Sequence, residues 1–161
     1  MFNLKKETYL KILFLSSFTI LLSAYVVQYL LGYQPCNLCI VERVPYALSL
    51  IVLIFNHIFK KDQAFYSILL LLIFSFSFLI SVYHFGIEQG FISESNVCGS
   101  NNSDKTTKEE ILKSLQVIII SCKDVAFKIF GFSLTTYNMI ISIFMFLIST
   151  KIYLINNEIQ K

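Results

Sequence analysis

The chain has 161 residues, of which 56% are hydrophobic and 16% aromatic, and its formal net charge is +3. A composition this apolar excludes an ordinary soluble domain of the same length and is typical of an integral membrane protein. The small positive charge, without a concentrated basic patch, argues against a nucleic-acid-binding protein.

Four long apolar segments predict membrane-spanning helices. They cover residues 12–31, 44–59, 64–85 and 134–155. A helix needs about 20 residues to cross a hydrocarbon core of about 30 Å, and the second segment is near the lower limit. The segments are continuously apolar rather than alternating, which disfavours a membrane β-barrel. The predicted fold class is therefore an all-α membrane protein, a bundle of four transmembrane helices in one domain.

The first segment, residues 12–31, follows Lys5, Lys6 and Lys11, and a positively charged start is also a property of signal peptides. The segment is longer than a typical apolar signal core and lacks a clear small-x-small cleavage site. We therefore expect an uncleaved membrane helix.

A pair of cysteines follows in residues 32–43, which we predict to be a short loop. The stretch YQPCNLCIVER places Cys36 and Cys39 three residues apart. This spacing suits a redox-active dithiol and also half of a zinc site. Zinc would need four ligands, and the other two cysteines of the chain do not form a second close pair, so redox exchange is favoured and no metal site is expected. Reduced cysteines without a redox role are the remaining alternative.

Arg43 and Pro45 determine the geometry expected around this motif. On a continuous helix the Arg43 guanidinium would share a face with both cysteines, where it would stabilise a thiolate or a reduced acceptor. Pro45 favours a helix that begins near Val44, because proline is tolerated in a first turn and disrupts a helix interior. Taken alone, Arg43 is better explained as an interfacial anchor paired with Glu42.

The longest polar region covers residues 86–133, between the third and fourth apolar segments, and contains Cys98 and Cys122. Its centre, SESNVCGSNNSDKTTKEE, has the composition of a loop. The stretch KEEILKSLQVIII, residues 108–120, has apolar residues at helical spacing and predicts a short amphipathic helix in the membrane interface. A helix packed on the bundle is an equally good interpretation.

The number of membrane crossings places all four cysteines on one face. An even number of predicted helices separates residues 32–43 from residues 86–133, and no predicted helix contains a cysteine. Because disulfides persist on the oxidising side of a membrane, we expect the cysteines outside and both termini in the cytoplasm. Charge agrees weakly, since seven of the 13 Lys and Arg residues lie on the side of the termini and six on the other.

A dithiol at the membrane boundary needs an electron acceptor. The sequence has no haem motif, no iron–sulfur spacing and no nucleotide-binding fingerprint. A lipid-soluble quinone fits this location.

The motif PCNLCIVER resembles the signature of the DsbB family of disulfide-bond formation proteins, which act with quinone in the bacterial inner membrane. The stretches YHFGIEQGF and SCKDVAFKIFGFSLTTYN also resemble family segments, at the end of the third helix and the entry to the fourth. The resemblance extends over most of the chain. Pro45 and the absence of Trp depart from familiar members, which affects the expected quinone geometry rather than the route through the thiols.

The resemblance implies a relay of two cysteine pairs. A reduced thioredoxin-fold oxidase of the DsbA type would attack a Cys98–Cys122 disulfide at Cys98, and Cys122 would then pass the electrons to Cys36. Cys39 would face the quinone, expected to be ubiquinone rather than menaquinone, and Arg43 would bind and polarise its ring.

His84 and the loop disulfide each have a structural alternative. The resemblance makes His84 a candidate quinone-site residue, while a helix-packing histidine bonded to a backbone carbonyl is nearly as good an explanation. A disulfide that closes a loop of about 25 residues would stabilise the fold by about 3.5 kcal/mol, so Cys98–Cys122 also suits a structural bridge. Its polar surroundings favour an exchange site, because a partner must be able to reach it.

Two other functions use the same residues. A vitamin K epoxide reductase-like enzyme shares four helices and paired cysteines but has its membrane-proximal pair late in the chain, whereas here that pair comes first. A non-enzymatic membrane protein would use the cysteines as metal ligands or structural bridges. The favoured function is a quinone-dependent protein-disulfide oxidoreductase of the bacterial inner membrane.

Overall fold

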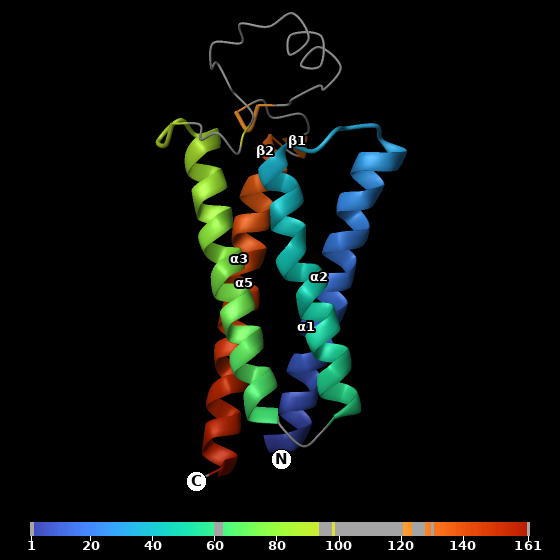
Figure 1. Ribbon diagram of the computed structural model, residues 1–161, viewed down its shortest axis with the longest axis vertical. Coiled ribbons are helices and arrows are strands. Elements are labelled where there is room, and N and C mark those ends of the chain that lie inside the picture. The colour runs from blue at the N-terminus through green and yellow to red at the C-terminus, as the bar shows by residue number, and fades with distance from the viewer. Residues whose placement is uncertain are drawn as a thin grey trace, which may run out of the picture.

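The computed structural model describes residues 2–59, 63–93, 98, 121–123, 128–129 and 131–160. The described residues form four long helices: α1 (Phe2–Tyr25), α2 (Asn37–Ile58), α3 (Gln63–Glu88) and α5 (Leu134–Gln160). A π-helical turn, η1 (Val26–Leu30), extends α1, and two short antiparallel strands, β1 (Lys128–Ile129) and β2 (Phe132–Ser133), precede α5. The helices run side by side as an upright bundle, with both chain ends at the same end of the molecule (Figure 1).

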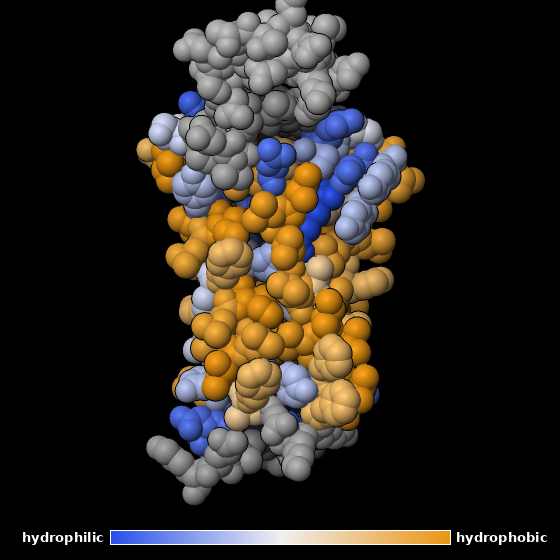
Figure 2. Space-filling model, in the orientation of Figure 1, coloured by the Kyte–Doolittle hydropathy of each residue, from blue (hydrophilic) through white to orange (hydrophobic). Residues whose placement is uncertain are grey.

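Each of the four helices is long and apolar enough to cross a membrane. Apolar side chains form a broad band around the middle of the molecule, and hydrophilic residues gather towards its two ends (Figure 2). Less than half of each candidate span is buried inside the bundle, so most of the apolar surface faces outward, as it does in lipid. The predicted all-α bundle of four membrane helices is confirmed.

The interior of the bundle combines apolar packing with small polar side chains. Its largest buried cluster comprises Leu13, Tyr46, Val52, Leu53, Leu70, Phe74, Met145, Ile148 and Ile152. Buried serines accompany this cluster on all four helices, and Ser49 of α2 donates a hydrogen bond of 2.9 Å to Ser17 of α1. Small residues allow membrane helices to approach closely, and their hydroxyls join helices within the hydrocarbon region.

The second helix begins at Asn37, so the predicted start near Val44 is wrong and most of the predicted loop 32–43 is helical. Cys36 caps this helix: its backbone is extended, with ψ at 166°, and its sulfur accepts a hydrogen bond of 3.2 Å from the backbone N–H of Cys39. The cap satisfies one of the free N–H groups that a helix start leaves, which allows the helix to begin at the cysteine motif.

Pro45 lies inside α2 and is buried there. A proline in a helix interior removes one backbone hydrogen bond and costs about 3 kcal/mol in an isolated helix. In a membrane protein the neighbouring helices offset this cost, and α2 packs against both α1 and α3. Tertiary packing therefore outweighs the local preference on which the sequence prediction rested.

The other boundaries differ because hydropathy marks the hydrocarbon region and not the end of a helix. α1 begins before the predicted segment 12–31, and α3 and α5 extend beyond the predicted segments 64–85 and 134–155. The sequence did not predict the two short strands within residues 86–133. The predicted interfacial helix at residues 108–120 lies outside the described residues.

Candidate active site

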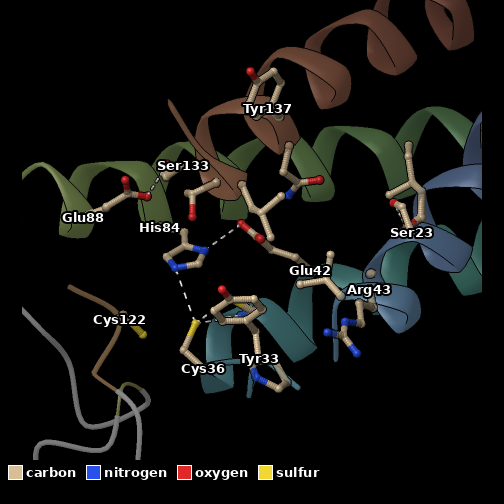
Figure 3. A pocket seen from close by; sticks show the side chains of 18 of the residues that line it. Ser23, Tyr33, Cys36, Glu42, Arg43, His84, Glu88, Cys122, Ser133 and Tyr137 are labelled. Atoms are coloured by element: carbon tan, nitrogen blue, oxygen red, sulfur yellow. Dashed lines mark hydrogen bonds and ion pairs between the residues drawn. The ribbon is translucent and has the colours of Figure 1, made fainter. Parts of the chain in front are cut away.

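A cavity of about 350 Å³ lies at the end of the bundle opposite the chain termini. Side chains from α1, α2, α3 and α5 line it (Figure 3). Its lining includes five of the six residues predicted to act in the site, and the sixth, Cys98, is bonded to one of them. The residues named from the sequence therefore converge at one end of the bundle.

Cys36 and Cys39 are free thiols at the start of α2. Their sulfur atoms lie 2.7 Å apart. A disulfide needs a separation of about 2.05 Å, so a small rotation of either side chain allows the bond to form. The pair can thus alternate between dithiol and disulfide without a large movement of the helix.

His84 of α3 joins Cys36 to Glu42 (Figure 3). Its Nε2 atom lies 3.6 Å from the Cys36 sulfur, and its Nδ1 atom lies 3.1 Å from Oε1 of Glu42. Both His84 and Glu42 are buried, with 2% and 7% of their surfaces exposed. When Nδ1–H donates to the carboxylate, Nε2 remains an acceptor that faces the thiol. The arrangement suits proton exchange between Cys36 and the imidazole.

This geometry differs from two sequence interpretations. His84 contacts Cys36 and Glu42 rather than the backbone carbonyl of the structural alternative. Glu42 pairs with His84, and not with Arg43 as the anchor interpretation required. Sequence reasoning missed this contact because His84 and Glu42 lie on different helices. The available signal was an acidic residue inside an apolar segment, which predicts a partner within the bundle.

The Cys36 thiol is more acidic than an ordinary thiol. The hydrogen bond with Cys39 is the main cause that lowers the pKa of Cys36 to about 5, and the hydrogen bond and charge of His84 lower it further, while burial opposes them. A thiolate is therefore the dominant form of Cys36 near neutral pH.

Arg43 is held at the cavity by two residues that sequence reasoning missed. Its guanidinium donates a hydrogen bond to the Gln28 side chain of η1 and lies over the Tyr25 ring of α1, 5.3 Å from the ring centroid. A cation over an aromatic ring is stabilised by the ring quadrupole. These contacts hold a positive charge beside the cavity without neutralising it.

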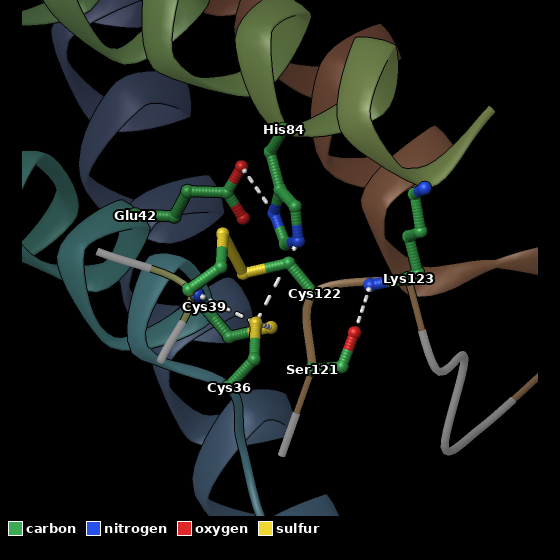
Figure 4. Close-up of a disulfide and its surroundings, with 8 residues drawn as sticks. Cys36, Cys39, Glu42, His84, Ser121, Cys122 and Lys123 are labelled. Carbon is green, nitrogen blue, oxygen red and sulfur yellow. Dashed lines mark hydrogen bonds and ion pairs between the residues drawn. A yellow bond between two sulfur atoms is a disulfide. The ribbon is translucent and has the colours of Figure 1, made fainter. Parts of the chain in front are cut away.

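Cys98 and Cys122 form a disulfide, the pairing that the family resemblance implied (Figure 4). The bond is buried, with 0% of Cys98 and 4% of Cys122 exposed. It packs in one cluster with Cys36, Leu38 and Ile87. The bond therefore lies in apolar packing against α2 and α3, and not in the polar surroundings expected from the sequence.

The side of the cavity towards the bundle centre is held by a hydrogen-bond network that the sequence analysis also missed. The Tyr46 hydroxyl donates to Oδ1 of Asn138 at 2.7 Å, and Nδ2 of Asn138 donates to the Ser81 hydroxyl at 2.9 Å. These bonds join α2, α5 and α3 within the hydrocarbon region. Polar residues inside apolar helices are the only sequence signal for such a network.

Comparison with known proteins gives two matches of interest. The family model "Disulfide bond formation protein DsbB" matches residues 6–152. The chain is also similar to "Uncharacterized protein RP370" of Rickettsia prowazekii (strain Madrid E), with 32% identity over 147 residues, which cover 87% of this chain and 85% of the relative. No solved structure matches the chain at a comparable level of significance. The family match includes both cysteine pairs and Arg43, Glu42 and His84.

Proposed function

Because this chain belongs to the DsbB family of disulfide bond formation proteins, we propose that it reoxidises a DsbA-type thiol oxidase and passes the electrons to membrane quinone. The family makes the chain a multi-pass membrane protein that acts as a disulfide oxidoreductase. The observation that carries the finer proposal is that the Cys36–Cys39 dithiol and the Cys98–Cys122 disulfide pack against each other beside one cavity.

The first step is thiol–disulfide exchange with the partner. A thiolate of the reduced oxidase attacks Cys98, forms a mixed disulfide and releases Cys122 as a thiolate. The second thiol of the partner then attacks the mixed disulfide, so the partner leaves oxidised and Cys98 leaves as a thiol. Because the loop disulfide is buried, the segment that carries it must first separate from Leu38 and Ile87.

The second step passes the two electrons to the other pair. Cys122 lies in the same buried cluster as Cys36, which supports Cys36 as the sulfur that Cys122 attacks when the Cys36–Cys39 pair is oxidised. Attack of Cys122 on Cys36 releases Cys39 as the leaving thiolate. Cys98 then attacks Cys122, which restores the loop disulfide and leaves Cys36 and Cys39 reduced.

The third step needs an acceptor in the cavity. Quinone supplies an acceptor for two electrons and two protons. Cys39 and Arg43 both line the cavity, and apolar side chains of α1 and η1, including Ile20 and Val27, supply a wall suited to an apolar ring. Arg43 stabilises negative charge that develops on an acceptor oxygen. Oxidation of the Cys36–Cys39 dithiol re-forms its disulfide, so its two electrons and two protons would go to the quinone. His84 would take the Cys36 proton in this step, and Glu42 orients the imidazole.

The proposed orientation follows from the arrangement of the bundle. The cysteine cluster lies at one end and both termini lie at the other. Disulfide exchange with a secreted oxidase requires the cysteine end to face the periplasm, which places the termini in the cytoplasm and the protein in the bacterial inner membrane.

The test is a coupled assay with purified protein, a reduced thioredoxin-fold oxidase and ubiquinone. Quinol formation is followed by absorbance. We expect turnover by the unmodified chain and none by Cys39→Ser. Ser75→Ala is the matched control, because the Ser75 hydroxyl donates a hydrogen bond to the Leu71 carbonyl of its own helix and Ser75 does not line the cavity. A chain that forms no quinol, or a Cys39→Ser variant with full turnover, would refute the proposal. Reduction of vitamin K epoxide with the same chain would support the vitamin K epoxide reductase-like alternative.

A further inference from the structure

We propose that the reduced Cys36, Cys39 and His84 side chains form a binding site for Zn²⁺, which inhibits the electron relay when it is occupied. This inference rests on the proposed function, since it assigns a regulator to the same dithiol. From sequence, zinc is disfavoured because the four cysteines do not form two close pairs. The fold adds His84 from α3, and the three ligand atoms lie within 4.8 Å of one another.

The distances between the ligand atoms approach those of a tetrahedral site. With Zn–S about 2.3 Å and Zn–N about 2.0 Å, a sulfur and a nitrogen that bind one ion lie about 3.6 Å apart. The Cys36 sulfur and Nε2 of His84 are 3.6 Å apart. Two sulfur ligands would lie about 3.8 Å apart, whereas those of Cys36 and Cys39 are 2.7 Å apart. Binding therefore requires the side chain of the less buried Cys39 to rotate so that its sulfur moves away from that of Cys36 by about 1 Å.

Glu42 supplies the support that histidine ligands of zinc commonly have. Its carboxylate lies 3.1 Å from Nδ1 of His84. A carboxylate in this position holds the proton on Nδ1 and leaves the lone pair of Nε2 directed at the metal. The cavity beside Cys39 leaves room for a water molecule as the fourth ligand. Three protein ligands and one open position are a recognised form of zinc coordination.

The chemistry makes this site specific for the reduced state. Zinc binds the two sulfurs as thiolates, so thiol protons are released to solvent and no electron is transferred. The disulfide form of the pair has no thiolate to offer. In the bound state neither sulfur can attack an acceptor or form the Cys36–Cys39 bond, so occupancy stops the relay at the dithiol. Cys98 and Cys122 are bonded to each other and contribute no thiolate.

Cobalt is the probe for this site, because Co²⁺ replaces zinc and its thiolate bonds absorb in the near ultraviolet. The full chain carrying Cys98→Ser and Cys122→Ser, which removes the loop thiols, is reduced in detergent and titrated with Co²⁺ and then Zn²⁺. We expect one Co²⁺ per chain, a thiolate absorption band and its loss on addition of Zn²⁺. Cys36→Ser and His84→Ala should lose most of the affinity, and Glu42→Gln should lower it about 10-fold to 100-fold.

The oxidised form of the same chain is the control that needs no further substitution. The oxidised chain should give no thiolate–cobalt absorption band. Ser75→Ala, introduced into the chain that carries Cys98→Ser and Cys122→Ser, should bind Co²⁺ as tightly as that chain does without it. A band that persists after oxidation or in Cys36→Ser would overturn the proposal, as would the absence of a band in the reduced parent. The titration contains neither quinone nor oxidase, and the quinol assay contains EDTA. A chain that forms quinol and binds no cobalt refutes only the zinc site, and the converse refutes only the proposed function.

Discussion

The lowered pKa of Cys36 predicts a large change in the ionisation of this thiol when Cys39 is replaced. Replacing Cys39 by Ala removes the thiol that makes the largest contribution to the lowered pKa of Cys36. The pKa falls from an ordinary 9.0 to about 5 in the intact site. At pH 7 a thiol with a pKa of about 5 is about 99% ionised, and one with a pKa of about 9 is about 1% ionised. Cys39→Ala should therefore move the ionisation of Cys36 well towards alkaline pH.

The assay is thiolate absorbance near 240 nm, which does not require a reagent to reach the buried sulfur. It is recorded between pH 4 and pH 10 with EDTA, on the reduced chain with the loop cysteines replaced by Ser. The sign for stability follows from linkage: a lowered pKa adds stability that is complete above about pH 9 and is lost as pH falls through about pH 5. A Cys36 transition near pH 9 in the parent, or no difference in Cys39→Ala, would refute this account.

Three further predictions concern single contacts. Arg43→Ala should raise the apparent KM for quinone about 10-fold with a smaller change in kcat, because about 1.4 kcal/mol of binding is lost; an unchanged KM would make the residue an interfacial anchor. Gly86→Ala would bring a Cβ within 2.7 Å of Cδ1 of Ile92. This atom is the free end of an exposed side chain that can rotate away, and alanine is favoured over glycine in a helix, so thermal stability in detergent should change by less than about 1 kcal/mol; a larger loss would mean that Ile92 is held in place. Tyr46→Phe should lose about 0.6–1.7 kcal/mol through its bond to Asn138, measured by unfolding in detergent.

The parts of the fold predicted from sequence are those that depend on local composition. Continuous apolar segments identified the four helices, because the length of a span is fixed by the thickness of the membrane. Counting crossings placed Cys36 and Cys122 at the same end without any knowledge of packing. The start of α2 was missed because it depends on a cap by the Cys36 thiol, which is rare among capping side chains.

The missing parts of the site are contacts between helices. Glu42 and His84 are adjacent only after α2 and α3 pack together, and nothing in either segment specifies the rotation of one helix about the other. Gln28 lies in the π-helical turn that follows α1, so its bond to Arg43 depends on a local departure from α-helical geometry. The loop disulfide is buried because Cys98 and Cys122 pack with Leu38 of α2 and Ile87 of α3, a contact that the composition of the loop does not determine.

That burial gives a prediction that separates docking of the disulfide from general stability. Ile87 is fully buried and packs in the cluster that holds Cys98 and Cys122. Ile87→Val removes one methylene group at a cost of about 1 kcal/mol. If this loss destabilises the state in which the disulfide packs against Ile87, the population of the state in which the disulfide has separated from α3 should rise about 5-fold. The rate of reduction of the disulfide by dithiothreitol should rise by the same factor.

The matched control is Ile152→Val, because Ile152 is equally buried, with 1% exposed, but lies in the other core cluster of the bundle. Both substitutions should lower the thermal stability of the bundle by a similar amount. Only Ile87→Val should accelerate reduction of the loop disulfide, and it should also accelerate mixed-disulfide formation with the reduced oxidase. Equal reduction rates in the two variants would mean that the disulfide is exposed by general unfolding of the bundle, so local separation from α3 would not be the event that admits the partner.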